Sequence, residues 1–156
     1  PDAGGTQTDR IGLGTTFYDE VGRVWKSERC KIDQSDGSND DQLQTLTWHD
    51  AEGRVTKVDG EQLTKTLYDR LSRATHQFTL AKDNDAAYAD TDDVSGDIVL
   101  EERQTTYEGT ASDNVVMSAA IERFHDDLAN GTTGALDTNA DADAFAYTAA
   151  NVLFRF

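Results

Sequence analysis

The chain has 156 residues and a formal net charge of −16, with 30 Asp and Glu residues against 14 Lys and Arg. This length suits one ordinary domain or a short run of small stacked units. An acidic surface lacks the basic face that phosphate binding needs, and anionic lipid repels it. The composition therefore argues against nucleic acid as a partner and against binding to anionic membranes, and it leaves room for divalent cations.

Targeting signals and disulfides are not expected in this sequence. The longest apolar run falls far short of the roughly 20 residues that a membrane span requires, so membrane insertion is not expected. Cys30 is the single cysteine, which excludes an intrachain disulfide, and we expect it to act as a hydrophobic residue on a strand. The start of the chain has no signal-peptide pattern. Residues 1–14 open mid-pattern, as a piece of a longer protein would, and are expected to form a flexible N-terminal segment.

The first hairpin is expected at 15–28, around the turn in the segment 17–24 (FYDEVGRV). Asp19 is placed to accept hydrogen bonds from the backbone of a type I turn. Gly22, three residues later, supplies the left-handed conformation that starts the returning strand in register.

The same phrase recurs twice, at 48–55 (WHDAEGRV) and at 67–74 (LYDRLSRA). In the third copy Ser72 occupies the glycine position, so we expect about 1 kcal/mol of left-handed strain there. A fourth turn, after Tyr107, is degenerate, and a fifth, weaker copy falls at 121–126. Repetition on this scale predicts stacked supersecondary units that bury their faces against one another.

Between these turns the sequence alternates strands with polar loops. Polar loops are expected at 34–41 and at 82–96, the second one acidic and long. Segment 54–58 alternates with period two, as a half-buried strand does. The remaining strand segments expected from β-branched and apolar content are 43–48, 63–67, 74–80, 98–100, 103–107 and 115–117.

The motif Tyr-Asp-x-x-Gly-Arg followed by Val or Leu resembles the signature of the YD-repeat family, also called Rhs repeats. Residues 18–24 match it fully, 49–55 differ by His for Tyr, and 68–73 differ by Ser for Gly. The resemblance covers 15–126 as a YD-repeat region. It implies an all-β chain of successive antiparallel hairpins in an open, spiralling sheet. Residues 127–156 are expected to form an acidic loop and a degenerate, truncated C-terminal repeat.

The resemblance also implies a function. Larger members of the family are secreted or cell-surface proteins whose repeats wall a hollow shell around a toxic domain, or act in adhesion. It carries over no active site, because the repeats are wall material. The residues expected to have a structural role in the repeat turns are Tyr18, Asp19, Gly22, Arg23, His49, Asp50, Gly53, Arg54, Tyr68, Asp69 and Arg73.

Each repeated Arg is expected near the Asp of its own or the next turn. Charge-assisted hydrogen bonds of this kind would form a ladder that fixes the register of the hairpins. The open ends of the sheet carry unpaired strand edges, which invite neighbouring repeats or a second copy to associate.

One weak calcium candidate lies near the C-terminus, because Asp137, Asn139, Asp141 and Asp143 place side-chain oxygens at alternate positions. A calcium loop needs Gly at its sixth position and Glu at its twelfth, and Ala142 and Thr148 stand there instead. A solvated acidic loop is the other interpretation. No other cofactor is expected.

Other chemistry-bearing residues have structural interpretations. His49 and His125 occupy aromatic positions of the repeat, and His76 stands outside any metal-ligand spacing. Trp25 and Trp48 either brace neighbouring strands or stack on sugars. The sequence thus predicts a structural or interaction segment without catalysis. Two alternatives stay open: a carbohydrate- or calcium-dependent binding module, and a hydrolase that uses an unrecognised carboxylate pair.

Overall fold

The structure is a computed structural model that describes residues 12–33, 35–85, 91–109, 111–123 and 133–136, and the backbone of 152–155. These residues form β-strands joined by turns and loops. The strands are β1 (Gly12–Tyr18), β2 (Val24–Ile32), β3 (Asn39–His49), β4 (Val55–Asp59), β5 (Leu63–Tyr68), β6 (Ala74–Lys82), β7 (Ile98–Tyr107), β8 (Val115–Arg123) and β9 (Val152–Arg155).

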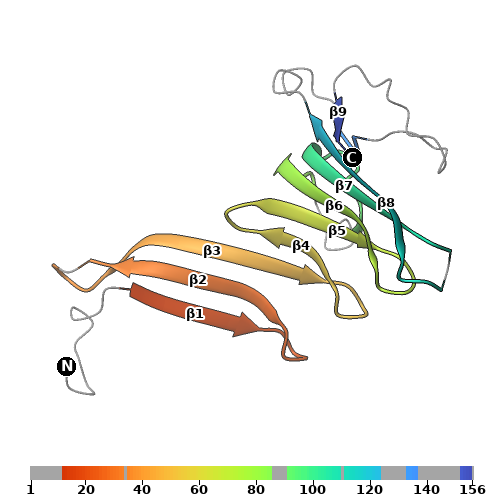
Figure 1. Cartoon of the computed structure of the whole chain (residues 1–156). Helices are drawn as coiled ribbons and strands as arrows, with labels where there is room; N and C mark the ends of the chain where they lie inside the picture. Colours follow the sequence, from red (N-terminus) through yellow and green to blue (C-terminus); the bar gives the residue numbers. More distant parts are fainter. Residues whose placement is uncertain are drawn as a thin grey trace. The chain divides into compact units, whose positions relative to one another are not determined.

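The predicted all-β class and the successive antiparallel pairing are confirmed (Figure 1). The chain divides into two compact units, one of residues 1–47 with 58–61, the other of 48–57 with 62–156. In the first unit β1 pairs with β2 and β2 with β3. In the second unit β5 to β9 pair in chain order. Among the described residues no helix is long and apolar enough to cross a membrane.

A bulge marks the start of the strand that follows the first, third and fourth turns. Phe17 opposes Lys26 but Tyr18 opposes Val24, which leaves Trp25 as an extra residue on β2. The same offset recurs at the beginning of β6 and of β8, where Thr75 and Val116 are the extra residues. A bulge adds local twist to a strand pair. The bulge therefore accompanies these turns, including the fourth, where the motif is degenerate.

The second unit has its core on one face of the sheet. Lys65, Phe78, Glu102 and Ile121 stand opposite one another on β5 to β8. The buried apolar cluster on this face contains Phe78, Leu80, Val94, Val99, Ile121 and Leu136. Two of its members come from outside the strands, since Val94 lies in the connection between β6 and β7 and Leu136 follows β8. The described parts of these two connections therefore cover the face of the sheet.

Two buried lysines fix the acidic connection between β6 and β7 to the sheet. Lys57 on β4 pairs with Asp83, and its Nζ lies 2.9 Å from an oxygen of Asp85. Lys65 on β5 lies 2.7 Å from Asp85 and 2.6 Å from Asp97. The position of this loop was predicted from sequence, but its inward-facing carboxylates were not.

Two strand boundaries and the burial of one strand differ from those expected. Asn39–Asp41, expected in a loop, belong to β3 because their backbone pairs with the end of β2, where Lys31 opposes Asp40. β1 begins at Gly12, within the segment expected to be flexible. On β4 both Thr56 and Lys57 are buried, so this strand is covered on both faces rather than half-buried.

The third turn carries the expected strain, since Ser72 has φ 63° where Gly22 and Gly53 both have φ 85°. Ser72→Gly should therefore stabilise the protein by about 1 kcal/mol, because glycine adopts this conformation without a Cβ clash. The midpoint of urea unfolding measures the change.

Gly22→Ser is the matched control and should destabilise by a similar amount. An added Cβ at Gly22 meets no atom within 4 Å, so only the backbone conformation would be strained. A Ser72→Gly midpoint at or below the wild-type value would contradict the argument.

Candidate functional site: the Asp–Arg–Tyr turn ladder

The first turn is built around one carboxylate. Asp19 accepts the amide N–H of Gly22 at its backbone carbonyl (3.0 Å) and donates its own amide to the carbonyl of Arg23 (2.8 Å). Its Oδ1 accepts the amides of Val21 (3.0 Å) and Arg23 (2.8 Å). Its Oδ2 accepts Nε of Arg23 at 2.7 Å. Through its carboxylate and its backbone carbonyl, Asp19 thus accepts the amides of Val21, Gly22 and Arg23.

The second and third turns repeat this pattern. Oδ1 of Asp50 accepts the amide of Arg54 at 2.9 Å, and its Oδ2 accepts Nε of Arg54 at 2.5 Å. Oδ1 of Asp69 accepts the amides of Leu71 (2.8 Å) and Arg73 (3.0 Å), and its Oδ2 accepts Nε of Arg73 at 2.7 Å. The expected pairing of each Arg with the Asp of its own turn is therefore present at all three turns.

These hydrogen bonds favour the ionised carboxylates. The backbone amide of Arg23, with its guanidinium, lowers the pKa of Asp19. The Arg73 side chain and backbone lower the pKa of Asp69 in the same way. Burial by itself raises the pKa of Asp50, but the hydrogen bonds from Arg54 outweigh it, and the net pKa is lowered.

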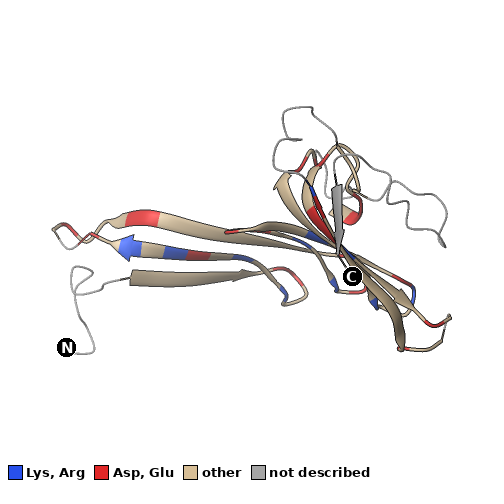
Figure 2. Ribbon diagram, turned by 45° about the horizontal axis from the view of Figure 1, so that its top comes forward, with Lys and Arg blue, Asp and Glu red and all other residues tan. Residues whose placement is uncertain are grey.

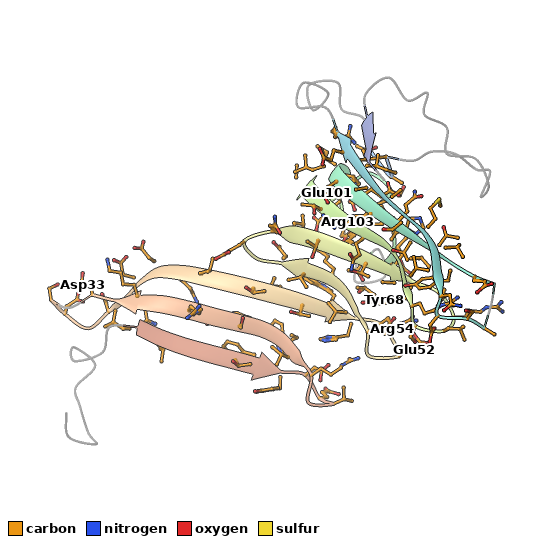
Figure 3. All side chains as sticks on the ribbon, viewed as in Figure 1. Asp33, Glu52, Arg54, Tyr68, Glu101 and Arg103 are labelled. Carbon is orange, nitrogen blue, oxygen red and sulfur yellow. The ribbon has the colours of Figure 1, made fainter. Side chains whose placement is uncertain are left out.

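Arg54 also reaches the next turn. Its Nη1 donates to the backbone carbonyl of Asp69 at 3.1 Å, and its guanidinium carbon lies 4.9 Å from the ring centroid of Tyr68. The hydroxyl of Tyr68 donates back to the carbonyl of Val55 at 2.9 Å. Figure 3 shows Arg54, Tyr68 and Glu52 gathered at this turn. A guanidinium over an aromatic face is a favourable contact in addition to its hydrogen bonds.

Arg73 of the third turn contacts the fourth turn in a similar way. The guanidinium carbon of Arg73 lies 4.3 Å from the ring centroid of Tyr107, and Arg73 Nη1 donates to the carbonyl of Ser112. The Tyr107 hydroxyl donates to the carbonyl of Ala74 at 3.0 Å. The ladder defined by Arg54, Tyr68, Arg73 and Tyr107 therefore joins three successive turns of the second unit.

The fourth turn, which lacks the motif, keeps part of its geometry. Glu108 takes the place of Asp, and its amide donates to the carbonyl of Asn114 at 2.8 Å. Asn114 Nδ2 donates to Glu108 Oε2 at 2.9 Å, which replaces the missing Arg–carboxylate bond. Sequence reasoning missed this pairing. The pairing could have been inferred from the strand that begins at Val115, because a strand begins directly after each motif Arg and Asn114 stands at the corresponding position.

The other candidate residues lie in structural settings or outside the described residues. Trp25 packs against Phe17 with ring centroids 6.0 Å apart, and Lys57 lies over the Trp48 ring at 4.6 Å. His76 stacks on Phe78 at 5.9 Å. His125 and the calcium candidate of Asp137, Asn139, Asp141 and Asp143 lie outside the described residues. Within the described ranges, no group of three or more His, Cys, Asp or Glu residues is placed to hold a metal ion.

Acidic and basic residues lie close together at turns, as the Asp–Arg pairs require (Figure 2). The carboxylates of Asp19, Asp50 and Asp69 already accept backbone amides and a guanidinium, so they are poorly placed to exchange a proton or bind a cation. The ladder can hold hairpins in register.

No protein-family model and no curated protein matches this chain.

Arg54→Met should lower the thermal unfolding midpoint by on the order of 5 °C, because it removes charge-assisted bonds within and between turns. The Arg54 side chain is only 23% exposed. Differential scanning calorimetry measures the shift.

Arg103→Met is the matched control, because Arg103 pairs with Glu101 at 2.8 Å but is 64% exposed, and such pairs contribute little. It should leave the midpoint unchanged. Equal effects of the two substitutions would show that the ladder has no special role.

Stability should fall as the pH drops below about 5. The folded-state pKa values of Asp19, Asp50 and Asp69 are lowered, whereas the unfolded value is about 3.9. The stability they contribute is therefore present above the unfolded pKa and is lost as the pH falls through the folded pKa. Urea midpoints from pH 7 to pH 2 measure the curve.

Asp69→Asn should flatten this acid limb, because it removes one carboxylate that titrates differently in the two states. Glu20→Gln, at an exposed position of the first turn, should follow the wild-type curve. An Asp69→Asn curve parallel to wild type would be the contrary result.

Proposed function

We propose that the chain is a structural, non-catalytic segment of a secreted or cell-surface YD-repeat protein, acting as a shell wall or an adhesion module. The observation that supports this most is the shared use of one arginine by two turns. Arg54 binds the carboxylate of Asp50 and the backbone of Asp69. Arg73 likewise binds Asp69 and reaches the turn that follows.

This arrangement suits scaffolding because each hairpin supplies part of the next hairpin's turn. A lone hairpin is marginal in water, so a chain of this kind gains stability from neighbours. The motif residues are committed to hydrogen bonds with their own backbone and with the next repeat. That commitment favours a wall over a catalytic site.

The partners of such a segment are further repeats of a longer chain, or a second copy that pairs at a sheet edge. An encapsulated domain or surface glycans would lie against the wall. Nucleic acid and membrane insertion have no place in this proposal, and calcium enters only if the segment 137–143 binds it.

The edge strand β1 offers a test, because among the described strands it pairs with β2 alone. Sedimentation velocity over a range of concentrations should show association of the chain, and Thr16→Glu on β1 should weaken it by placing a charge at the edge. Thr106→Glu is the matched control, since Thr106 is also exposed but lies on β7 between two paired strands. A chain that stays monomeric at all concentrations would contradict edge-to-edge pairing.

One alternative has an observation in its favour. Trp25 is 43% exposed and Tyr18 is 62% exposed, so aromatic surface is open at the first turn. A carbohydrate-binding module would use such rings for stacking. Glycan-array binding that is lost in Trp25→Ala would favour this alternative, and absence of glycan binding would favour the scaffold.

A further inference from the structure

The buried amine of Lys65 lies against two carboxylate oxygens and one backbone carbonyl oxygen. Its Nζ lies 2.6 Å from Oδ2 of Asp97, 2.7 Å from Oδ1 of Asp85 and 2.7 Å from the backbone carbonyl of Asp93. The side chains of Lys65 and Asp97 are 0% exposed, and that of Asp85 is 8% exposed. Lysine and aspartate are seldom buried so completely.

The pair lies beside the buried apolar cluster, and the second oxygen of Asp97 is held by a separate donor. Phe78 stands opposite Lys65 in the sheet, and Val94 belongs to the same buried cluster as Phe78. Oδ1 of Asp97 accepts the backbone amide of Asn84 at 2.8 Å. One oxygen of the carboxyl group thus faces the amine, while the other faces a fixed N–H donor.

We propose that Lys65 and Asp97 form an intramolecular isopeptide bond. A nucleophilic amine, a polarised acyl group and a proton acceptor are the three parts that amide formation needs. Lys65 supplies the amine, and the Asn84 amide stabilises negative charge that develops on Oδ1. Asp85 lies within hydrogen-bond distance of Nζ and accepts one of its protons.

The step balances without any oxidant or co-reactant. The Lys65 ammonium gives one proton to the Asp97 carboxylate, which converts the ion pair into an amine and a carboxylic acid. The Nζ lone pair then attacks Cγ of Asp97. A second proton leaves Nζ through Asp85 and reaches the departing oxygen, which leaves as water. The products are one amide N–H group and one water molecule, and both charges are lost.

The environment favours this product. A buried ion pair carries a desolvation penalty, and a neutral amide removes it. The bond would join β5 to the residue before β7, positions 32 apart in the sequence. It would therefore close a long loop covalently, as a disulfide does in other proteins.

Intact-mass spectrometry of the full chain, purified in its folded state and then denatured, tests the proposal. The expected mass is one water below that of the sequence. Peptide mapping should recover one branched peptide that joins Lys65 to Asp97. A folded wild-type chain at the full sequence mass would overturn the proposal, and this readout does not depend on any variant folding.

Variants assign the loss to this pair. Lys65→Arg and Asp97→Ala should have the full sequence mass, whereas Lys57→Arg, the matched control at the neighbouring buried lysine, should still lack one water. Asp97→Asn should lose ammonia instead, and Asp85→Asn should slow the mass change after refolding. A water loss that persists in Lys65→Arg would place the dehydration elsewhere and overturn the assignment. The proposed scaffold function does not depend on this bond, so either can fail alone.

Discussion

The structure depends on one interaction, the acceptance of several N–H donors by the carboxylate at the start of each of the first three turns. In the first turn Asp19 binds two backbone amides and the guanidinium of Arg23. These groups lie within five consecutive residues, so the turn forms without help from distant segments. The strands on either side can then vary in length, from five residues in β4 to eleven in β3, without changing the turn.

The two ends of the hairpins in the second unit are stabilised by different interactions. At the turn end the same set of contacts is repeated: Arg54 and Arg73 each bind the Asp of their own turn and the backbone of the next turn. At the loop end the contacts do not repeat from one hairpin to the next. The connection between β6 and β7 bends over the sheet and is fixed there by Lys57 and Lys65. The turns thus fix the register of the strands, and the connection between β6 and β7 buries one face of the sheet.

The sequence predicted the local part of this structure and missed the distant part. The spacing of Asp69, Ser72 and Arg73 defined a turn and its left-handed strain, because all the interacting groups lie within a few residues. Lys65 reads as an ordinary strand residue, since its partner Asp97 is far along the chain. Asn39–Asp41 read as a loop because they are polar, yet pairing with β2 makes them a strand. Propensity is overruled where a neighbouring strand offers hydrogen bonds.

The central claim is that one arginine couples two turns, and a double-mutant cycle on Arg54 and Tyr68 tests it most directly. The free energies of unfolding of Arg54→Met, Tyr68→Leu and the double variant are compared with that of the wild type. Coupled residues give a double variant that is less destabilised than the sum of the two single changes, by more than the experimental error. Strict additivity would mean that the second and third turns form independently, and the ladder would then be a contact without energetic meaning.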